Sequence, residues 1–285
     1  MRRKPAVAGM FYSRDPEQLR AEIEHAFLGE LGPGALPSVS PLRIGKVLGI
    51  VSPHAGYMYS GYAAAHAFAA LAEDGMPDVA VIIGPNHRGM GVPLAIVEKG
   101  FWDTPLGEIA IDEGVSASLL RNCRYMQADA SAHASEHSLE VQAPFLQYLA
   151  PGKTRIVPIA VGIGPRDAAS VVAELGACIA AAVEGTDAVI IASTDMTHYE
   201  SKASAQSKDA LAIEALKTLD SGELLDVVVK AGITMCGAVP AAIAADACQK
   251  MGAGKAELLT YYTSGDVTGD ISQVVGYAAM KIIRA

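Results

Sequence analysis

Three of the chain's seven histidines follow short apolar runs that are typical of buried strands. Each follows a different run: His54 comes after 47–51, His87 after 79–83, and His198 after 188–192. In an open α/β sheet, the carboxyl ends of parallel strands open onto one common crevice. Three imidazoles at one sheet edge would suit a metal site, a proton-transfer site, or both.

His54 and His87 occupy equivalent positions after their strands. Neutral imidazole suits zinc, copper and iron alike, so this pair does not identify a metal. Cys236 precedes a predicted helix that begins near Ala238. A thiol at a helix N-terminus has a lowered pKa and is more available as a thiolate ligand.

Asp195 and His198 are three residues apart, so a helical turn would place them on one face. A carboxylate bound to one ring nitrogen fixes the tautomer and raises the basicity of the other nitrogen. The pair therefore suits an oriented general base or a supported metal ligand. The simpler alternative is that Asp195 only caps a turn.

A further polar group, Glu136, His137 and Glu140, lies at the start of a predicted helix over 138–149. Acidic residues are favoured at a helix N-terminus by the helix dipole, so this group could be only a cap. The helix continues with apolar residues that indicate packing, however. We therefore expect its polar end to face the crevice.

Strands and helices alternate along most of the chain. We expect strands over 46–51, 78–83, 155–161, 188–192, 257–263 and 273–282, a hairpin or edge strands over 93–97 and 108–111, and helices over 16–28, 62–73, 112–122, 138–149, 166–183, 205–219, 223–230 and 238–250. The continuous apolar strands indicate burial on both faces. With no repeat or linker, residues 1–285 are predicted to form a single α/β domain, a sandwich with a central mixed, largely parallel sheet flanked by helices.

The composition excludes several classes of function. The net charge is −9 without a basic run, which argues against nucleic acid and acidic membrane surfaces as partners. No segment reaches the roughly 18 apolar residues of a membrane span. Neither nucleotide-binding glycine motif nor a G-x-S-x-G nucleophile is present.

The four cysteines are widely spaced and form no C-x-x-C pair. Cys178 and Cys248 lie in alanine-rich helical patterns, where a small buried side chain is the ordinary interpretation. We therefore expect a reduced, cytoplasmic protein.

Several motifs, in order along essentially the whole chain, resemble the Memo family. They are Ala6-Val-Ala-Gly-Met-Phe-Tyr, Pro53-His-Ala-Gly-Tyr, Gly84-Pro-Asn-His, Glu136-His-Ser-Leu-Glu-Val-Gln, Ser193-Thr-Asp-Met-Thr-His, Cys236-Gly and Ser264-Gly-Asp. The resemblance implies a fold similar to that of class III extradiol dioxygenases, which are non-haem iron enzymes. Bacterial and archaeal members belong to the AmmeMemoRadiSam system as its protein B, so radical-SAM system proteins are possible partners.

The resemblance also implies roles for individual residues. His54, His87 and Cys236 would bind one metal ion, and His198 would do acid–base work with support from Asp195. His137 would line the same pocket, and we expect Glu140 and Asn86 to be further substrate-binding residues. Fe(II) is the expected ion, although a cysteine ligand shifts preference toward Cu(I) or Zn(II).

Two functions follow from the resemblance. The first is a dioxygenase-type oxidoreductase that acts on a small chelating or aromatic substrate. The second is a non-enzymatic adaptor that binds a metal or a peptide at a vestigial site. A third possibility, a zinc hydrolase with Glu140 as its base, would require an activated water.

Overall fold

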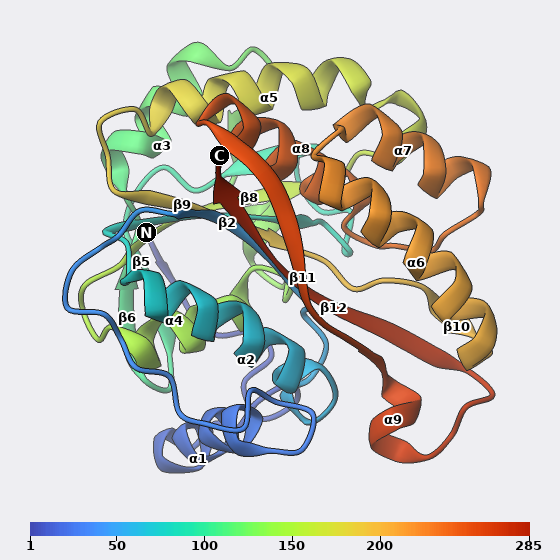
Figure 1. The fold of residues 1–285 in the computed structure, drawn as a ribbon. Helices are drawn as coiled ribbons and strands as arrows, with labels where there is room; N and C mark the ends of the chain where they lie inside the picture. Colours follow the sequence, from blue (N-terminus) through green and yellow to red (C-terminus); the bar gives the residue numbers. More distant parts are fainter.

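Four parallel strands form the centre of the main sheet in the computed structural model, which describes residues 1–285 (Figure 1). They lie in the order β2 (Val47–Ser52), β9 (Ala188–Ser193), β3 (Val79–Pro85) and β8 (Arg155–Val161). Every residue of these strands except Arg155 is buried. This burial explains their continuous apolar sequence, because helices cover both faces of the sheet.

The strands that flank this centre make the sheet mixed. On one side, β12 (Val274–Arg284) runs antiparallel to β2 and also pairs with β10 (His198–Glu200) and β11 (Ala253–Thr263). On the other side, β4 (Leu94–Ile96) runs antiparallel to β8, and β7 (Gln127–Ala128) pairs with β4. The predicted α/β fold is confirmed, with parallel pairing concentrated in the middle of the sheet.

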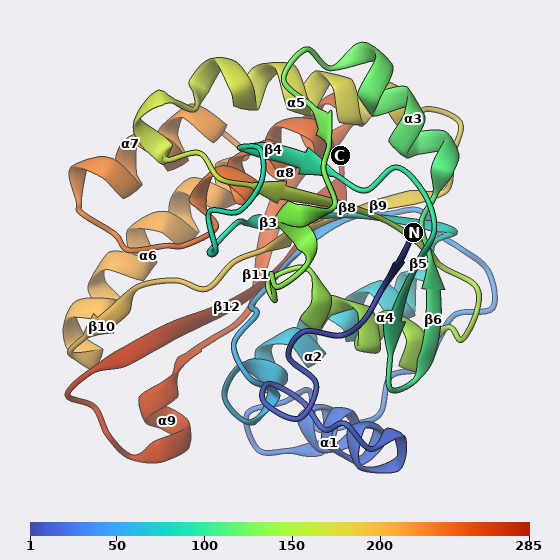
Figure 2. The same ribbon diagram turned by 180° about the vertical axis from the view of Figure 1, so that it is seen from behind.

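Helices cover the sheet in two layers (Figures 1 and 2). One layer holds α3 (Glu113–Asn122), α5 (Ala169–Ala182), α6 (Lys202–Thr218), α7 (Ser221–Lys230) and α8 (Ala238–Lys250); the other holds α1 (Pro16–Leu28), α2 (Tyr57–Asp74) and α4 (Ala143–Leu149). In β3, Val79, Val81 and Ile83 join one core, whereas Ala80 and Ile82 join the other. Side chains alternate along a strand, so the same sheet supports both cores.

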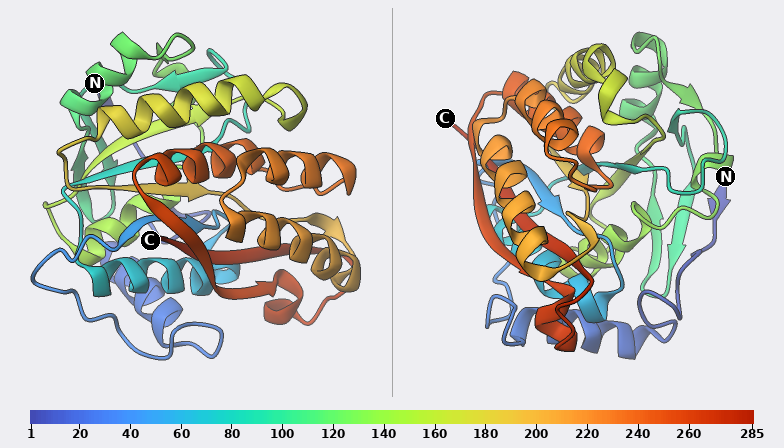
Figure 3. Two further views of the ribbon diagram at one scale, coloured as in Figure 1. Left: turned by 45° about the horizontal axis from the view of Figure 1, so that its top comes forward. Right: turned by 90° about the vertical axis from the view of Figure 1, so that its right-hand side faces the viewer.

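Two smaller features complete the fold. The short helix α9 (Ser264–Thr268) lies between β11 and β12, where Figure 3 shows it at one end of the molecule. A second sheet consists of β1 (Arg2–Arg3), β5 (Phe101–Thr104) and β6 (Gly107–Ala110). The predicted strand over 108–111 therefore forms a hairpin with β5, and the one over 93–97 becomes β4 of the main sheet.

Two helices are shorter than predicted, one of them because of proline. The expected helix over 138–149 divides into a 3₁₀ turn at Glu140–Gln142 and α4. Pro144 has no amide hydrogen, and its ring would clash with the carbonyl of Glu140 in a continuous α-helix. The helix predicted over 166–183 begins only at Ala169, because Pro165–Asp167 form a separate 3₁₀ turn. None of the helices has both the length and the apolar character needed to cross a membrane.

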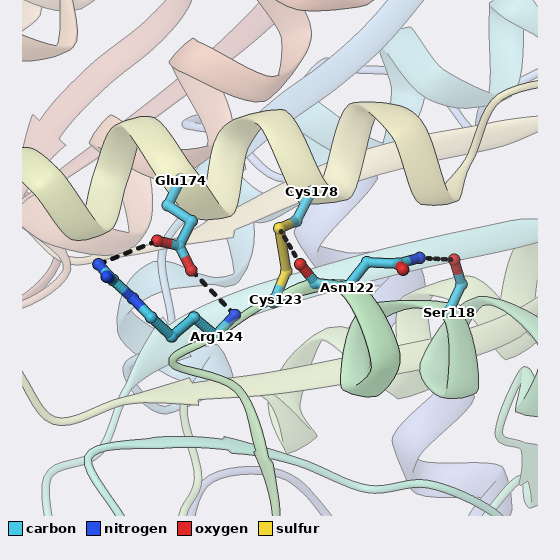
Figure 4. The surroundings of a disulfide bond; sticks show 6 residues. All are labelled: Ser118, Asn122, Cys123, Arg124, Glu174 and Cys178. Carbon is cyan, nitrogen blue, oxygen red and sulfur yellow. Dashed lines mark hydrogen bonds and ion pairs between the residues drawn. A yellow bond between two sulfur atoms is a disulfide. The ribbon is translucent and has the colours of Figure 1, made fainter.

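The structure corrects the expectation of four unpaired cysteines. Cys123 and Cys178 form a disulfide between the C-terminal end of α3 and the middle of α5 (Figure 4). Their Cα atoms are 5.8 Å apart, which is an ordinary separation for a disulfide. The helical pattern around Cys178 does not show which helix packs against it, so the pair was not predicted. Cys236 and Cys248 remain free thiols.

Candidate metal centre

The ends of three neighbouring parallel strands carry the candidate site. His54 follows β2 and His87 follows β3, while β9 lies between these two strands. The imidazole centroids of His54 and His87 are 5.1 Å apart. The prediction that these histidines share one sheet edge is confirmed.

Cys236 reaches the same edge from the loop that precedes α8. Its Sγ lies 3.2 Å from Nε2 of His54. A Cβ atom on the next residue, Gly237, would lie only 2.6 Å from the carbonyl oxygen of Ser193. Glycine is therefore required for this loop to approach β9 closely enough to bring the sulfur to the histidines.

Ser193 sets the tautomer of His54. The Ser193 hydroxyl donates its hydrogen to the carbonyl of Ser138 at 2.6 Å, and it accepts from Nε2 of Gln142 at 2.9 Å. It therefore acts as an acceptor toward Nδ1 of His54, 3.0 Å away. With the proton on Nδ1, the lone pair of Nε2 points toward Cys236 and is free to bind a metal.

Glu136 orients His87 in the corresponding way. Its carboxylate accepts from the His87 backbone N–H at 2.6 Å and from Nδ1 at 2.9 Å. It also accepts from the backbone N–H groups of His137 and Ser138, both at 2.8 Å. Burial alone would raise the pKa of Glu136, but these hydrogen bonds and the nearby imidazoles lower it to about 2. The carboxylate is thus ionised and leaves Nε2 of His87 free.

The donor set fits a transition-metal ion. One ligand atom from each of His54, His87 and Cys236 lies within 4.8 Å of the other two. Tetrahedral coordination at about 2.0–2.3 Å from each donor places the donors roughly 3.5 Å apart, so small adjustments suffice. The set is open on one side, because the His87 side chain is 29% exposed whereas His54 is buried. We refer to these three residues as the metal triad.

The electrostatic surroundings of Cys236 differ from the prediction. Burial, and then the carboxylate of Asp195, raise the pKa of its thiol instead of lowering it. The helix N-terminus does not offset the increase in the pKa of the thiol that burial causes. A bound cation would reverse the balance, because it stabilises the thiolate directly.

Asp195 and His198 are both near the triad, but they do not form the expected pair. The residues between them form no helical turn, and His198 begins β10. The Asp195 carboxylate accepts from the backbone N–H of His54 at 2.7 Å, and burial raises its pKa to about 6. Nδ1 of His198 instead lies 2.9 Å from the carbonyl of Thr234. That carbonyl can only accept, so the proton is on Nδ1, and Nε2 is the available base.

His137 lies against the triad. Its ring stacks on that of His87 with centroids 4.6 Å apart, and it lies 5.5 Å from that of His54. Burial lowers its pKa to about 4, although the nearby carboxylate of Glu136 acts in the opposite direction. At pH 7 His137 is therefore uncharged, and its partly buried ring lines one side of the site.

The other two predicted pocket residues are used elsewhere. The carboxylate of Glu140 is 1% exposed and binds the N-terminal segment, so it is not placed to be a hydrolytic base or to contact a substrate. The Asn86 amide donates to the carbonyl of Met90, and its oxygen accepts from the N–H of Gly89. These contacts form a local turn and occupy both ends of the amide.

Sequence reasoning treated Glu136 as a possible helix cap and did not consider Ser193 or Gln142. Glu136 and Ser193 each contact a histidine that is distant in the sequence, and Gln142 acts on His54 through the Ser193 hydroxyl. One signal was present, because Ser193 is a buried polar residue at the end of an apolar strand. A buried hydroxyl requires hydrogen-bond partners, and here the partners belong to the site.

A cavity of about 610 Å³ is lined by the N-terminal part of the chain and by no residue of the metal triad. It is formed by the loop over residues 9–15, one side of α1 and the first turns of α2; its lining includes Met10, Phe11, Arg14, Glu22, Met58 and Tyr62. The Phe11 ring centroid is 4.8 Å from that of His137. Phe11, which lines the cavity and contacts His137, is therefore the link between the cavity and the site.

The sheet and the triad together define an α/β protein with a candidate transition-metal centre at the carboxyl ends of its central strands. The chain belongs to the Memo family, since a family model described as Memo-like protein matches residues 3–281. It is 47% identical to a MEMO1 family protein of Methanopyrus kandleri over the full length of both chains. It is 45% identical to one of Methanothermobacter thermautotrophicus, over 99% of this chain and 100% of the relative.

Proposed function

We propose that the metal triad binds one transition-metal ion and that the protein is a non-haem, metal-dependent oxidoreductase of dioxygenase type. The observation that carries this proposal is the clustering of three donor atoms within 4.8 Å, with each histidine's Nδ1 engaged by a partner. Partners of this kind are characteristic of metal-binding histidines. Fe(II) is the proposed ion, and copper and zinc are the alternatives that metal analysis distinguishes.

The substrate proposed is a small aromatic or otherwise chelating molecule. The bound ion would supply a redox-active, Lewis-acidic centre with positions open to substrate. His198 would accept a substrate proton at Nε2, because the Thr234 carbonyl holds its other nitrogen. His137 and Phe11 would pack against the substrate's apolar part and restrict water.

Oxygen consumption tests this proposal. Protein loaded anaerobically with Fe(II) is expected to consume O₂ with at least one member of a catechol and hydroxy-acid panel. His198→Ala is expected to retain iron and lose turnover, whereas His66→Gln retains both. His66 is the control because its ring contacts the Leu31 carbonyl, away from the triad. Absence of O₂ consumption across the panel, with iron content confirmed, would contradict the oxidoreductase function.

A second candidate function is supported by the cavity that Phe11 lines. Its volume is within the range of small-ligand sites, and Met10 and Met58 on its rim are 70% and 67% exposed. We propose as the alternative a metal- or peptide-binding adaptor whose partners include radical-SAM system proteins. A partner that is captured by the wild type but lost in His54→Ala, without turnover in either protein, would favour this role.

A further inference from the structure

Arg3 makes three contacts to a segment that is far away in the sequence. Its Nε donates to the carbonyl of His133 at 2.6 Å, and its Nη2 donates to the carbonyl of Glu136 at 2.7 Å. Its Nη1 forms an ion pair with Glu140 at 2.7 Å, and both side chains are almost fully buried, at 2% and 1% exposure. The guanidinium also lies over the Trp102 ring, 4.3 Å from its centroid. Arg3 therefore contacts the segment 133–140 at its start, in its middle and at its end.

Glu140 continues this connection along the N-terminal segment. Its carboxylate accepts from the backbone N–H groups of Ala6 and Val7 at 2.7 and 3.0 Å and from the Tyr12 hydroxyl at 2.7 Å. Residues 3–12 are thus fastened to the segment 133–140 by two buried, oppositely charged side chains. Buried charges require pairing with an opposite charge, since leaving one unpaired is strongly destabilising.

The fastened segment carries the carboxylate that orients a metal ligand. Glu136 supplies one of the two carbonyls that Arg3 contacts, and its carboxylate accepts from both the backbone N–H and Nδ1 of His87. The Ser138 hydroxyl also donates to the carbonyl of Pro85 at 2.8 Å, which ties the segment to the end of β3. The position of His87 therefore depends on the backbone of 133–140, and that backbone is held by Arg3.

We propose that Arg3 is a positioning residue of the metal centre, which acts on His87 through the backbone and carboxylate of Glu136. It contacts neither the triad nor a substrate. The inference rests on the proposed function only in taking the triad to be the metal site. It adds that the N-terminal segment controls metal affinity and the tautomer of His87.

Arg2 provides a matched control for the experiment. It is the preceding residue in β1, is 56% exposed, and pairs with Asp103 and Glu108 instead of the segment 133–140. Arg3→Ala is expected to weaken Zn(II) binding about tenfold or more, the scale of other supporting-residue losses, whereas Arg2→Ala leaves it unchanged. Arg3→Lys keeps the charge but cannot reach all three acceptors, so partial recovery is expected. Low, non-denaturing guanidinium should also restore binding to Arg3→Ala.

A second measurement uses the metal-free protein. The ¹⁵N shifts of the His87 ring report its tautomer, and the Nδ1–H form is expected in wild type and Arg2→Ala but reduced in Arg3→Ala. If Arg3→Ala has only a lower melting temperature, with wild-type Zn(II) affinity and the wild-type His87 tautomer, the positioning role is overturned. If the wild type binds neither Zn(II) nor Co(II), the proposed function fails, and the His87 tautomer alone decides the role of Arg3.

Discussion

Sγ of Cys236 lies 3.2 Å from Nε2 of His54, although the two residues are 182 positions apart in the sequence. The contact joins the start of α8 to the end of β2. It is possible because Gly237 packs directly against Ser193 and Thr194 of the β9 end. Two strand ends and one helix end thus supply the three donors of the candidate centre.

Glu136→Gln is expected to weaken Zn(II) binding by roughly 10- to 100-fold, the usual effect of removing a carboxylate that supports a ligating histidine. The four N–H donors that now face the carboxylate would meet an amide with a single acceptor oxygen. Calorimetric titration measures the change. The exposed Glu98→Gln is the control, and equal affinities in the two variants would show that Glu136 does not orient His87.

His133 should make stability depend on pH. Its side chain is fully buried, neither ring nitrogen has a hydrogen-bond partner, and burial lowers its pKa to about 4. The unfolded chain therefore binds a proton near pH 6.5, whereas the folded chain binds it only near pH 4. The resulting stability is present above pH 6.5 and is lost as the pH falls to 4, by about 3 kcal/mol.

The variant His133→Phe tests this linkage, because it keeps an aromatic ring without a titrating group. Its free energy of unfolding relative to wild type should increase by about 3 kcal/mol between pH 7 and pH 4. Urea denaturation at both pH values measures this difference. Other histidines with lowered pKa, such as His54 and His137, titrate in both proteins and cancel. A constant difference between the two proteins would contradict the assignment.

The Cys123–Cys178 disulfide should stabilise the fold. It closes a loop with a sequence separation of 55 residues, for which loss of chain entropy in the unfolded state predicts about 4 kcal/mol. Cys178→Ser should therefore lower the denaturation midpoint, and reductant should affect the wild type but not the variant. Thiol titration of the unreduced, denatured wild type should find only Cys236 and Cys248 free. Four titratable thiols would mean that the bond is absent.

The sequence predicted the strand ends well because their patterns are local. The runs before His54 and His87 are apolar throughout, and buried parallel strands require that composition. Once these strands are parallel neighbours on either side of β9, their following residues must meet at one edge. The placement of the two histidines therefore followed from pattern and topology.

The supporting contacts could not be predicted because they depend on packing between distant segments. Arg3 and Glu140 carry no local pattern that distinguishes a buried ion pair from surface charges. The spacing of Asp195 and His198 was compatible with a helical turn, but His198 instead pairs with Val275 of β12 as a strand residue. The tertiary partner, rather than the spacing, determined the local conformation.

Metal content is the most direct test of the triad. Protein purified without chelators is expected to contain about one transition-metal ion per chain in the wild type and in Cys248→Ser, and far less in Cys236→Ser. Cys248 is the matched control because its thiol is fully buried within α8 and does not belong to the metal triad. Elemental analysis of the three proteins measures the difference. Equal metal content in wild type and Cys236→Ser would contradict a centre built on this sulfur.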